Sequence, residues 1–279
     1  MNAALEQSAR KRAANAVRFF RKEFGVRTAP VNCFRVAMDL RDSGKIRFDW
    51  EEADGRLSSG FDARAQYLPQ LDLYLVICRE LPERWETVSA RRRCNFTMAH
   101  ELGHIFCGHL KIPKNCKSDA TIALEHLEAN AFAAELLMPR EALGWFCSVQ
   151  EAADGLLVSQ TALRNRMRET GTLYALRTCP DCGFRRIPPA AAYCRECGRD
   201  LRETPAPPAE TEVSYLPFPP KACPVCGYDF PAGRYGECLW CYNPKRNHCL
   251  PEDNAPEHWC RDEAKYCEVC GSPTLYAAL

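Results

Sequence analysis

The sequence predicts an α+β fold with a small β-sheet over residues 1–175, followed by short cysteine-rich modules that are held together by metal ions. Two observations predict this division. Helical periodicity and β-patterned stretches are interspersed before residue 175, and 12 of the 18 cysteines lie between Cys179 and Cys270. Ten of those 12 form CxxC pairs, a spacing that suits a tetrahedral metal ion better than long-range disulfides.

The overall composition is that of an ordinary globular protein. The chain has 279 residues, is 46% hydrophobic and 26% charged, and carries a formal net charge of +1. This charge balance gives no strong field toward nucleic acid or a membrane surface. No apolar run approaches the roughly 20 residues that span a bilayer, and the charged N-terminus lacks the apolar segment of a signal peptide. We therefore expect a cytoplasmic protein with no membrane partner.

Apolar spacing and turn residues predict the elements of the first 175 residues. An amphipathic helix is expected over 1–24, and two β-patterned stretches follow, KIRFDW (45–50) and DLYLVIC (72–78). Three further helices are expected at 94–108, 122–137 and 140–154, the second ending before Met138-Pro139 because proline cannot continue a helix. Ser159 has the position of an N-cap for a last helix that stops at Gly171.

The helix predicted at 94–108 contains an HExxH motif, formed by His100, Glu101 and His104. Residues four apart share one helix face, so the two imidazoles can bind one metal ion. Glu101 projects beside that ion and can serve as the general base toward an attacking water molecule. A hydrolytic zinc site needs a third protein ligand, which must come from another segment. His109, near the end of this helix, is expected to be a C-terminal cap rather than a ligand.

A second motif follows on the next helix. The segments FTMAHELGH and EANAFAAELLMP together resemble the ImmA/IrrE family of metallopeptidases, and the likeness extends over roughly residues 1–175. The resemblance implies a zincin-like fold and limited regulatory proteolysis, often of a helix-turn-helix repressor. In that family the third ligand is typically a glutamate three residues before the alanine of the second motif, and this chain has His126 there.

The helix phase also favours His126. Asn130 lies four residues later on the same face and can orient a metal-bound imidazole through a hydrogen bond. Glu125 and Glu128 point roughly 100° and 160° away from His126 at about 100° per residue. We therefore predict a three-histidine site of His100, His104 and His126, and keep Glu125 first and Glu128 second as the alternative third ligand.

The cysteine-rich part contains an internal repeat. Two copies of CxxC-x11-CxxC predict four-cysteine zinc sites, one before a proline-rich linker (203–220) and one after it. The expected modules are ribbon 1 at 176–202 and ribbons 2 and 3 within 221–279. Pairing of the last eight cysteines stays open between a sequential and an interleaved scheme, and His248 or His258 could replace a cysteine in the last site. The sequential scheme has these ligands: Cys179, Cys182, Cys194 and Cys197; Cys223, Cys226, Cys238 and Cys241; Cys249, Cys260, Cys267 and Cys270.

These features together predict a zinc-dependent metalloendopeptidase with one catalytic and about three structural zinc ions. Its expected partner is a protein substrate, with a transcriptional repressor implied by the family resemblance. The alternative belongs to another class: a catalytically silent zincin-fold scaffold whose ribbons bind nucleic acid or protein. Glu101 argues against that alternative, because a purely structural metal site does not require a base there.

Overall fold

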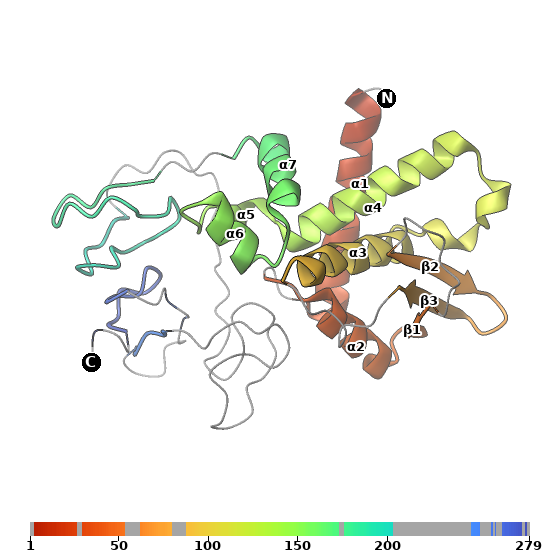
Figure 1. The fold of residues 1–279 in the computed structure, drawn as a ribbon, viewed down its shortest axis with the longest axis horizontal. Coiled ribbons are helices and arrows are strands. Elements are labelled where there is room, and N and C mark those ends of the chain that lie inside the picture. Colours follow the sequence, from red (N-terminus) through yellow and green to blue (C-terminus); the bar gives the residue numbers. More distant parts are fainter. Residues whose placement is uncertain are drawn as a thin grey trace. The chain divides into compact units, whose positions relative to one another are not determined.

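The computed structural model describes residues 3–26, 30–53, 62–79, 88–172, 176–202, 247–251, 258, 260, 264–274 and 277 (Figure 1). The cysteines predicted for ribbon 2, Cys223, Cys226, Cys238 and Cys241, lie outside these residues. The chain divides into two compact units, Met1–Pro139 with Leu157–Ala162, and Arg140–Leu156 with Leu163–Leu279. The domain boundaries expected from the sequence stay predictions.

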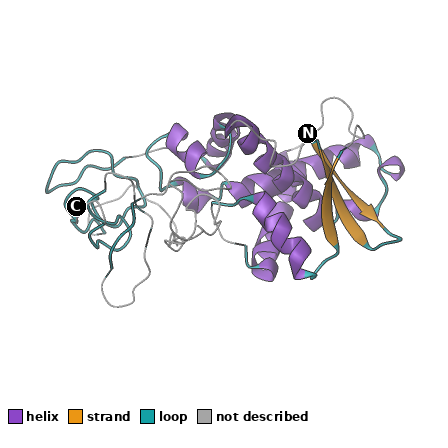
Figure 2. Ribbon diagram, turned by 60° about the horizontal axis from the view of Figure 1, so that its bottom comes forward, coloured by secondary structure: helices purple, strands orange, loops and turns teal. Residues whose placement is uncertain are grey.

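The first unit combines helices with a small sheet, which confirms the predicted α+β class (Figure 2). The sheet has the strand order β1-β3-β2, with β1 and β3 parallel and β2 and β3 antiparallel. Its strands are β1 (Phe48–Glu52), β2 (Ala63–Leu68) and β3 (Leu73–Cys78). Its helices are α1 (Ala3–Phe24), α2 (Cys33–Ser43), α3 (Val88–Phe106) and α4 (Asp119–Leu137), with short 3-10 turns η2 (His109–Lys111) and η3 (Lys114–Cys116).

Three features differ from the elements expected from the sequence. Strand β2 was not predicted, because its alternation depends on the small residues Ala63 and Ala65. Helix α2 was also missed, although Asn32 caps its first turn and Gly44 ends it at φ 63°. The single helix expected over 140–154 was wrong. The segment forms α5 (Arg140–Leu143) and α6 (Val149–Gly155), and α6 starts anew at the N-cap Ser148.

An aromatic cluster joins three of the helices in the first unit. Phe20 of α1 lies 4.4 Å from Phe106 of α3 and 5.9 Å from Phe132 of α4, measured between ring centroids. Phe24 adds a further contact to Phe106 at 5.4 Å. Burying side chains of this size contributes on the order of 1.5–3 kcal/mol each. The cluster therefore fixes α3 and α4 against α1.

Two polar side chains complete this packing. Arg21 of α1 donates to the carbonyl oxygens of Glu135 and Leu136 at 3.3 and 3.0 Å, which satisfies carbonyls in the last turn of α4. Asn95 of α3 is 2% exposed and accepts from the backbone N–H of Cys33 at 2.8 Å. Its amide also donates to the Val31 and Leu157 carbonyls, so one buried side chain ties α3 to two loops.

The second unit contains α5, α6 and ribbon 1, and most of α7 (Gln160–Thr170). The backbone N–H of Ala190 donates to the Gly144 carbonyl at 3.2 Å, and the Cys147 thiol donates to the Arg186 carbonyl at 3.3 Å. Ribbon 1 is therefore fastened to the α5–α6 segment. Among the described residues, no helix has the length and apolar character that crossing a membrane requires.

Removing the Asn95 side chain should destabilise the first unit. We expect Asn95→Ala to lower the free energy of unfolding by about 1–3 kcal/mol, because the Cys33 N–H loses its buried acceptor. Urea denaturation measures this change. Asn115→Ala, at an exposed position, is the matched control and should change stability little. Equal midpoints for the two variants would contradict the anchoring role of Asn95.

Candidate metal centre

Two helices supply the three histidines of the candidate metal site. His100 and His104 lie one turn apart on α3, and His126 lies on α4. Helix α3 stops soon after His104, since Gly108 takes a left-handed φ of 79° that other residues rarely adopt. Helix α4 begins at the N-cap Ser118, whose side chain accepts from the Thr121 N–H.

The glycine inside HExxH lets these two helices approach closely. A Cβ at Gly103 would lie 3.0 Å from the Ala129 Cα and 3.1 Å from the Phe132 Cβ. Those atoms belong to the backbone and the base of a buried side chain, so they cannot easily move. A side chain at position 103 would push α4 away from α3. Gly103 therefore sets the helix separation at which His126 reaches the other two histidines.

The three imidazoles converge on one point. The Nε2 atoms of His100 and His104 are 3.1 Å apart, and His126 Nδ1 lies 3.4 Å from His100 Nε2. One ring nitrogen from each histidine falls within 4.8 Å of the others. A tetrahedral zinc ion with Zn–N bonds of about 2.0–2.1 Å requires N···N separations of about 3.3–3.4 Å. The geometry of this group fits zinc, and a tetrahedral ion held by three residues keeps one position open.

The surroundings keep these imidazoles neutral, the form that binds metal. Burial lowers the pKa of His100 to about 4, and the neighbouring His126 makes the second-largest contribution to this shift. Burial and the adjacent histidines lower the pKa of His104 to about 2. Burial also lowers the pKa of His126. Each ring therefore offers a free lone pair at neutral pH.

Asn130 orients a different histidine from the one expected. Its Oδ1 lies 2.9 Å from His100 Nδ1, so the ring N–H donates to the amide oxygen and leaves His100 Nε2 free for the metal ion. The helix phase had placed Asn130 as a partner of His126. That expectation considered only α4, whereas in the structure Asn130 hydrogen-bonds across to α3.

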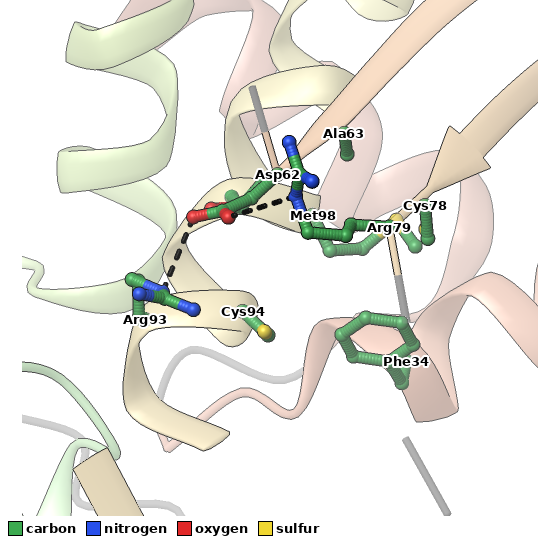
Figure 3. Close-up of a pocket in the computed structure, with 9 residues that line it drawn as sticks. Phe34, Asp62, Ala63, Cys78, Arg79, Arg93, Cys94 and Met98 are labelled. Carbon is green, nitrogen blue, oxygen red and sulfur yellow. Dashed lines mark ion pairs between the residues drawn. The ribbon is translucent and has the colours of Figure 1, made fainter. Parts of the chain in front are cut away.

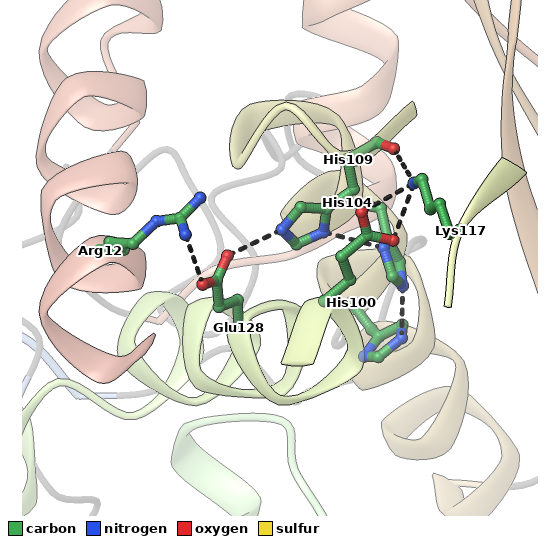
Figure 4. A network of polar contacts seen from close by, with 7 residues as sticks. Arg12, His100, His104, His109, Lys117 and Glu128 are labelled. Atoms are coloured by element: carbon green, nitrogen blue, oxygen red, sulfur yellow. Dashed lines mark hydrogen bonds and ion pairs between the residues drawn. The ribbon is translucent and has the colours of Figure 1, made fainter. Parts of the chain in front are cut away.

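A buried polar chain stands behind His104 (Figure 4). His104 Nδ1 lies 3.0 Å from His109 Nδ1, and His109 Nε2 lies 2.9 Å from Glu128 Oε2. The side chains of His109 and Glu128 are only 4% and 2% exposed. Arg12 of α1 closes the chain with an ion pair to Glu128 at 3.0 Å. The expectation that His109 caps a helix was wrong, because its ring bridges His104 to the Glu128 carboxylate.

The two alternative ligands have other partners. Glu128 belongs to the chain just described, and Glu125 forms an ion pair with Lys117 at 2.7 Å. Lys117 also donates to the His109 carbonyl. The histidine group contains neither carboxylate. The signal that could have identified Glu128 is its spacing four residues before Phe132, which places it on the buried face of α4.

Glu101 is buried next to the sheet. It is 7% exposed, and one of its carboxylate oxygens accepts from the Ala65 N–H of β2 at 2.6 Å. Burial raises the pKa of Glu101 to about 7, although the Ala65 hydrogen bond and nearby Arg64 oppose the shift. A carboxylate with such a pKa is suited to general-base chemistry near neutral pH. The role of the β2 backbone was not foreseen, since β2 itself was missed.

A small pocket lies near the start of α3 (Figure 3). Asp62 at its rim forms ion pairs with Arg79 at 3.8 Å and with Arg93 at 3.2 Å. Apolar side chains, including Phe34 and Met98, form the remaining wall. The one carboxylate that lines it, Asp62, is already paired with the two arginines, whereas one ring nitrogen from each of the three histidines lies within 4.8 Å of the others. We therefore take the histidine group, rather than this pocket, as the candidate functional site.

Ribbon 1 brings its four predicted cysteines together. The sulfur atoms of Cys179 and Cys197 are 3.7 Å apart, as are those of Cys182 and Cys194. Tetrahedral zinc with Zn–S bonds of about 2.3 Å requires S···S separations of about 3.8 Å, so this group fits a structural zinc ion. A small core supports it, formed by Ile187, Ala191 and Leu201 with the two buried cysteines.

The last cysteine group differs from the sequential scheme. The structure places Cys249, Cys267 and Cys270 together, but the fourth residue within 4.8 Å is His258 rather than Cys260. Cys260 lies beside the group, and its thiol donates to the His258 carbonyl at 3.5 Å. Every described cysteine is free of disulfide bonds.

The third ligand of the histidine group can be tested by metal content. We expect His126→Ala to lose one metal ion per chain in mass spectrometry, because two histidines alone hold zinc weakly. Glu125→Gln is the matched control on the same helix and should keep the full metal content, because its carboxylate pairs with Lys117. Loss of metal in Glu125→Gln, with none in His126→Ala, would move the ligand to Glu125.

The polar chain behind His104 predicts a second effect on metal binding. Glu128→Gln should weaken zinc binding by about 10–100-fold, since the His109 ring loses the carboxylate that orients it toward His104. Competition with a chromophoric chelator measures the affinity. Glu135→Gln on the same helix is the control and should leave it unchanged. An unaltered affinity in Glu128→Gln would show that the chain does not act on the metal.

Two known families match the chain, one over the segment with the histidine group and one over the cysteine-rich segment. Residues 87–144 match the IrrE N-terminal-like domain of the M78 peptidases, a range that contains all three histidines and Glu101. Residues 179–242 match the double zinc ribbon. No curated protein matches the chain. The histidine group and Glu101 thus lie in the segment that matches a metallopeptidase-like domain, and the chain combines an ImmA/IrrE-like domain with zinc ribbons.

Proposed function

We propose that the chain is a zinc-dependent metalloendopeptidase that performs limited, regulatory proteolysis of a protein substrate. The observation that carries this proposal is the spacing of the three imidazole nitrogens, which suits zinc, with Glu101 adjacent to His100 in the sequence. His100, His104 and His126 would hold the ion. When bound there, zinc would supply Lewis-acid polarisation of the substrate carbonyl and ease deprotonation of water.

Glu101 is the proton carrier in this proposal. Its buried carboxylate accepts a proton from the attacking water molecule and returns it to the nitrogen of the departing amine. The hydrogen bond from the Ala65 N–H holds one carboxylate oxygen in place. Burial favours this role, because a pKa near 7 allows the group both to accept and to release a proton at neutral pH.

The sheet supports a peptide as the substrate. In the described part of the sheet β2 is an edge strand, since it pairs with β3 on one side only. An edge strand presents backbone N–H and C=O groups that an extended peptide can pair with. Ala65, in the middle of β2, contacts Glu101 directly. An extended peptide added to this edge would therefore pass the general base.

The remaining features concern where the protein acts and on what. Metal-binding thiols need a reducing compartment, so we place the protein in the cytoplasm. The resemblance to ImmA/IrrE proteins makes a helix-turn-helix repressor the first substrate to test. The zinc ribbons would bring the substrate to the peptidase domain. In the alternative, the domain is a silent scaffold and the ribbons bind nucleic acid or protein.

The decisive comparison is between wild type and Glu101→Gln, using a purified candidate repressor. We expect the variant to cleave about 10²–10⁴-fold more slowly, because it has lost the general base. Its metal content should stay at the wild-type value, because Glu101 is not a ligand. Mass spectrometry of the fragments identifies the cleaved bond, and a chelator should abolish cleavage by wild type until zinc is restored.

Two results would reject this function. Equal cleavage by both proteins would mean that Glu101 does not act as the base. Absence of cleavage in fully metal-loaded wild type, across repressors and unfolded peptides, would favour the scaffold. Binding of DNA or protein by the wild type, without cleavage, would then identify the role of the ribbons.

A further inference from the structure

The C-terminal part of the second unit repeats a short motif of ribbon 1. The segment YCRECG (193–198) of ribbon 1 and the segment YCEVCG (266–271) each place a tyrosine before a CxxCG turn. We call the described residues within 247–274 the C-terminal module. The double zinc ribbon match ends at residue 242, so the module lies outside it.

The two segments have the same backbone conformation. In ribbon 1 the Gly198 N–H donates to the Cys194 carbonyl at 2.8 Å, and Gly198 has a φ of 75°. In the C-terminal module the Gly271 N–H donates to the Cys267 carbonyl at 2.9 Å, and Gly271 has a φ of 77°. This turn directs both cysteine side chains of a pair toward one metal ion, and its left-handed position favours glycine. The module therefore contains a formed metal-binding turn.

The two turns also contact each other reciprocally. The Ala192 and Tyr193 N–H groups both donate to the Glu268 carbonyl, at 2.8 and 3.0 Å. In return, the Lys265 and Tyr266 N–H groups both donate to the Arg195 carbonyl, at 2.9 and 3.0 Å.

The tyrosine rings repeat this relation. A Cβ on Gly198 would lie 3.0 Å from the Tyr266 ring, and a Cβ on Gly271 would lie 2.8 Å from the Tyr193 ring. Each glycine thus leaves room for the tyrosine of the other segment. The C-terminal module therefore packs against ribbon 1 through matching contacts. The cysteines predicted for ribbon 2 lie between the two in the sequence.

The remaining donors of the module come from Cys249 and His258. The Cys249 sulfur lies 3.8 Å from the Cys270 sulfur and 3.5 Å from His258 Nδ1. Tetrahedral zinc requires about 3.8 Å between two sulfur ligands and about 3.5–3.6 Å between a sulfur and a nitrogen ligand, from its usual bond lengths. Both separations match. The His258 N–H also donates to the Cys249 sulfur at 3.1 Å, which fixes His258 next to that ligand.

The rival donor is Cys260, whose side chain lies close enough to interact with the Cys249 and Cys267 thiols. Three observations favour His258. Its ring nitrogen belongs to the group whose donor atoms all lie within 4.8 Å, and it is 6% exposed, whereas Cys260 is half-buried. The Cys260 sulfur lies 3.5 Å from the His258 carbonyl, so it has a hydrogen-bond partner outside the metal-binding group.

We propose that Cys249, His258, Cys267 and Cys270 form a structural zinc site of three cysteines and one histidine, in the module that pairs with ribbon 1. His258 completes the tetrahedron, and Cys260 remains a thiol outside it. This site is independent of the peptidase chemistry. Zinc binding would supply the folding energy that so short a module cannot obtain from an apolar core.

Metal counting in the full-length protein tests the assignment. His258→Ala should lower the bound metal by one ion per chain, as measured by mass spectrometry. Cys260→Ala and His248→Ala are the matched controls in the same segment, and both should keep the wild-type metal content. Retention of metal by His258→Ala, or its loss in Cys260→Ala but not in His258→Ala, would overturn the proposal.

A second measurement separates a lost ligand from a misfolded module. His258→Cys should restore the metal, since cysteine is also a zinc ligand. In protein loaded with cadmium-113, NMR should show a resonance with scalar coupling to the ring protons of His258. That resonance should give way to a four-sulfur resonance in His258→Cys. Absence of the histidine coupling in wild type, or failure of His258→Cys to recover the metal, would overturn the assignment.

Discussion

The close contact between α3 and α4 at Gly103 is the constraint on which the metal centre depends. Two histidines come from one helix and the third from its neighbour, so their nitrogens can meet only at one helix separation. A Cβ at Gly103 would meet the Ala129 backbone at 3.0 Å, so glycine allows that separation. The aromatic cluster around Phe20 then holds both helices against α1. The packing of these helices therefore keeps the three unprotonated imidazoles close together.

Helix α1 also contacts the histidine group indirectly, through a series of polar side chains. Arg12 reaches Glu128, and Glu128 contacts His109, which lies against His104. A buried carboxylate without a partner is costly, but here it has a cation on one side and an imidazole on the other. These contacts orient the His104 ring through its Nδ1 and leave its Nε2 next to the Nε2 of His100. Asn130 does the same for His100, so two of the three histidines have a defined partner behind them.

The sequence predicted what depends on local spacing. HExxH, the second motif and the CxxC pairs lie within single elements, and the structure brings together the three histidines and the four cysteines of ribbon 1. It did not predict what depends on contacts between elements. Asn130 and His109 were assigned to partners on their own helices, yet both bind across to another element. Strand β2 was missed because Ala63 and Ala65 give a weak alternation, and with it the hydrogen bond from the Ala65 N–H to Glu101.

The fourth ligand of the last cysteine group is another feature that local spacing did not predict. Cysteine spacing alone made Cys260 the natural fourth ligand, because it lies in the segment between Cys249 and Cys267. Which donor reaches the metal depends instead on where the backbone places each side chain. The Cys249 N–H donates to the His258 carbonyl and the His258 N–H donates to the Cys249 sulfur, so these two residues are held face to face. Two hydrogen bonds thus bring an imidazole to the position where the count of cysteines had predicted a thiolate.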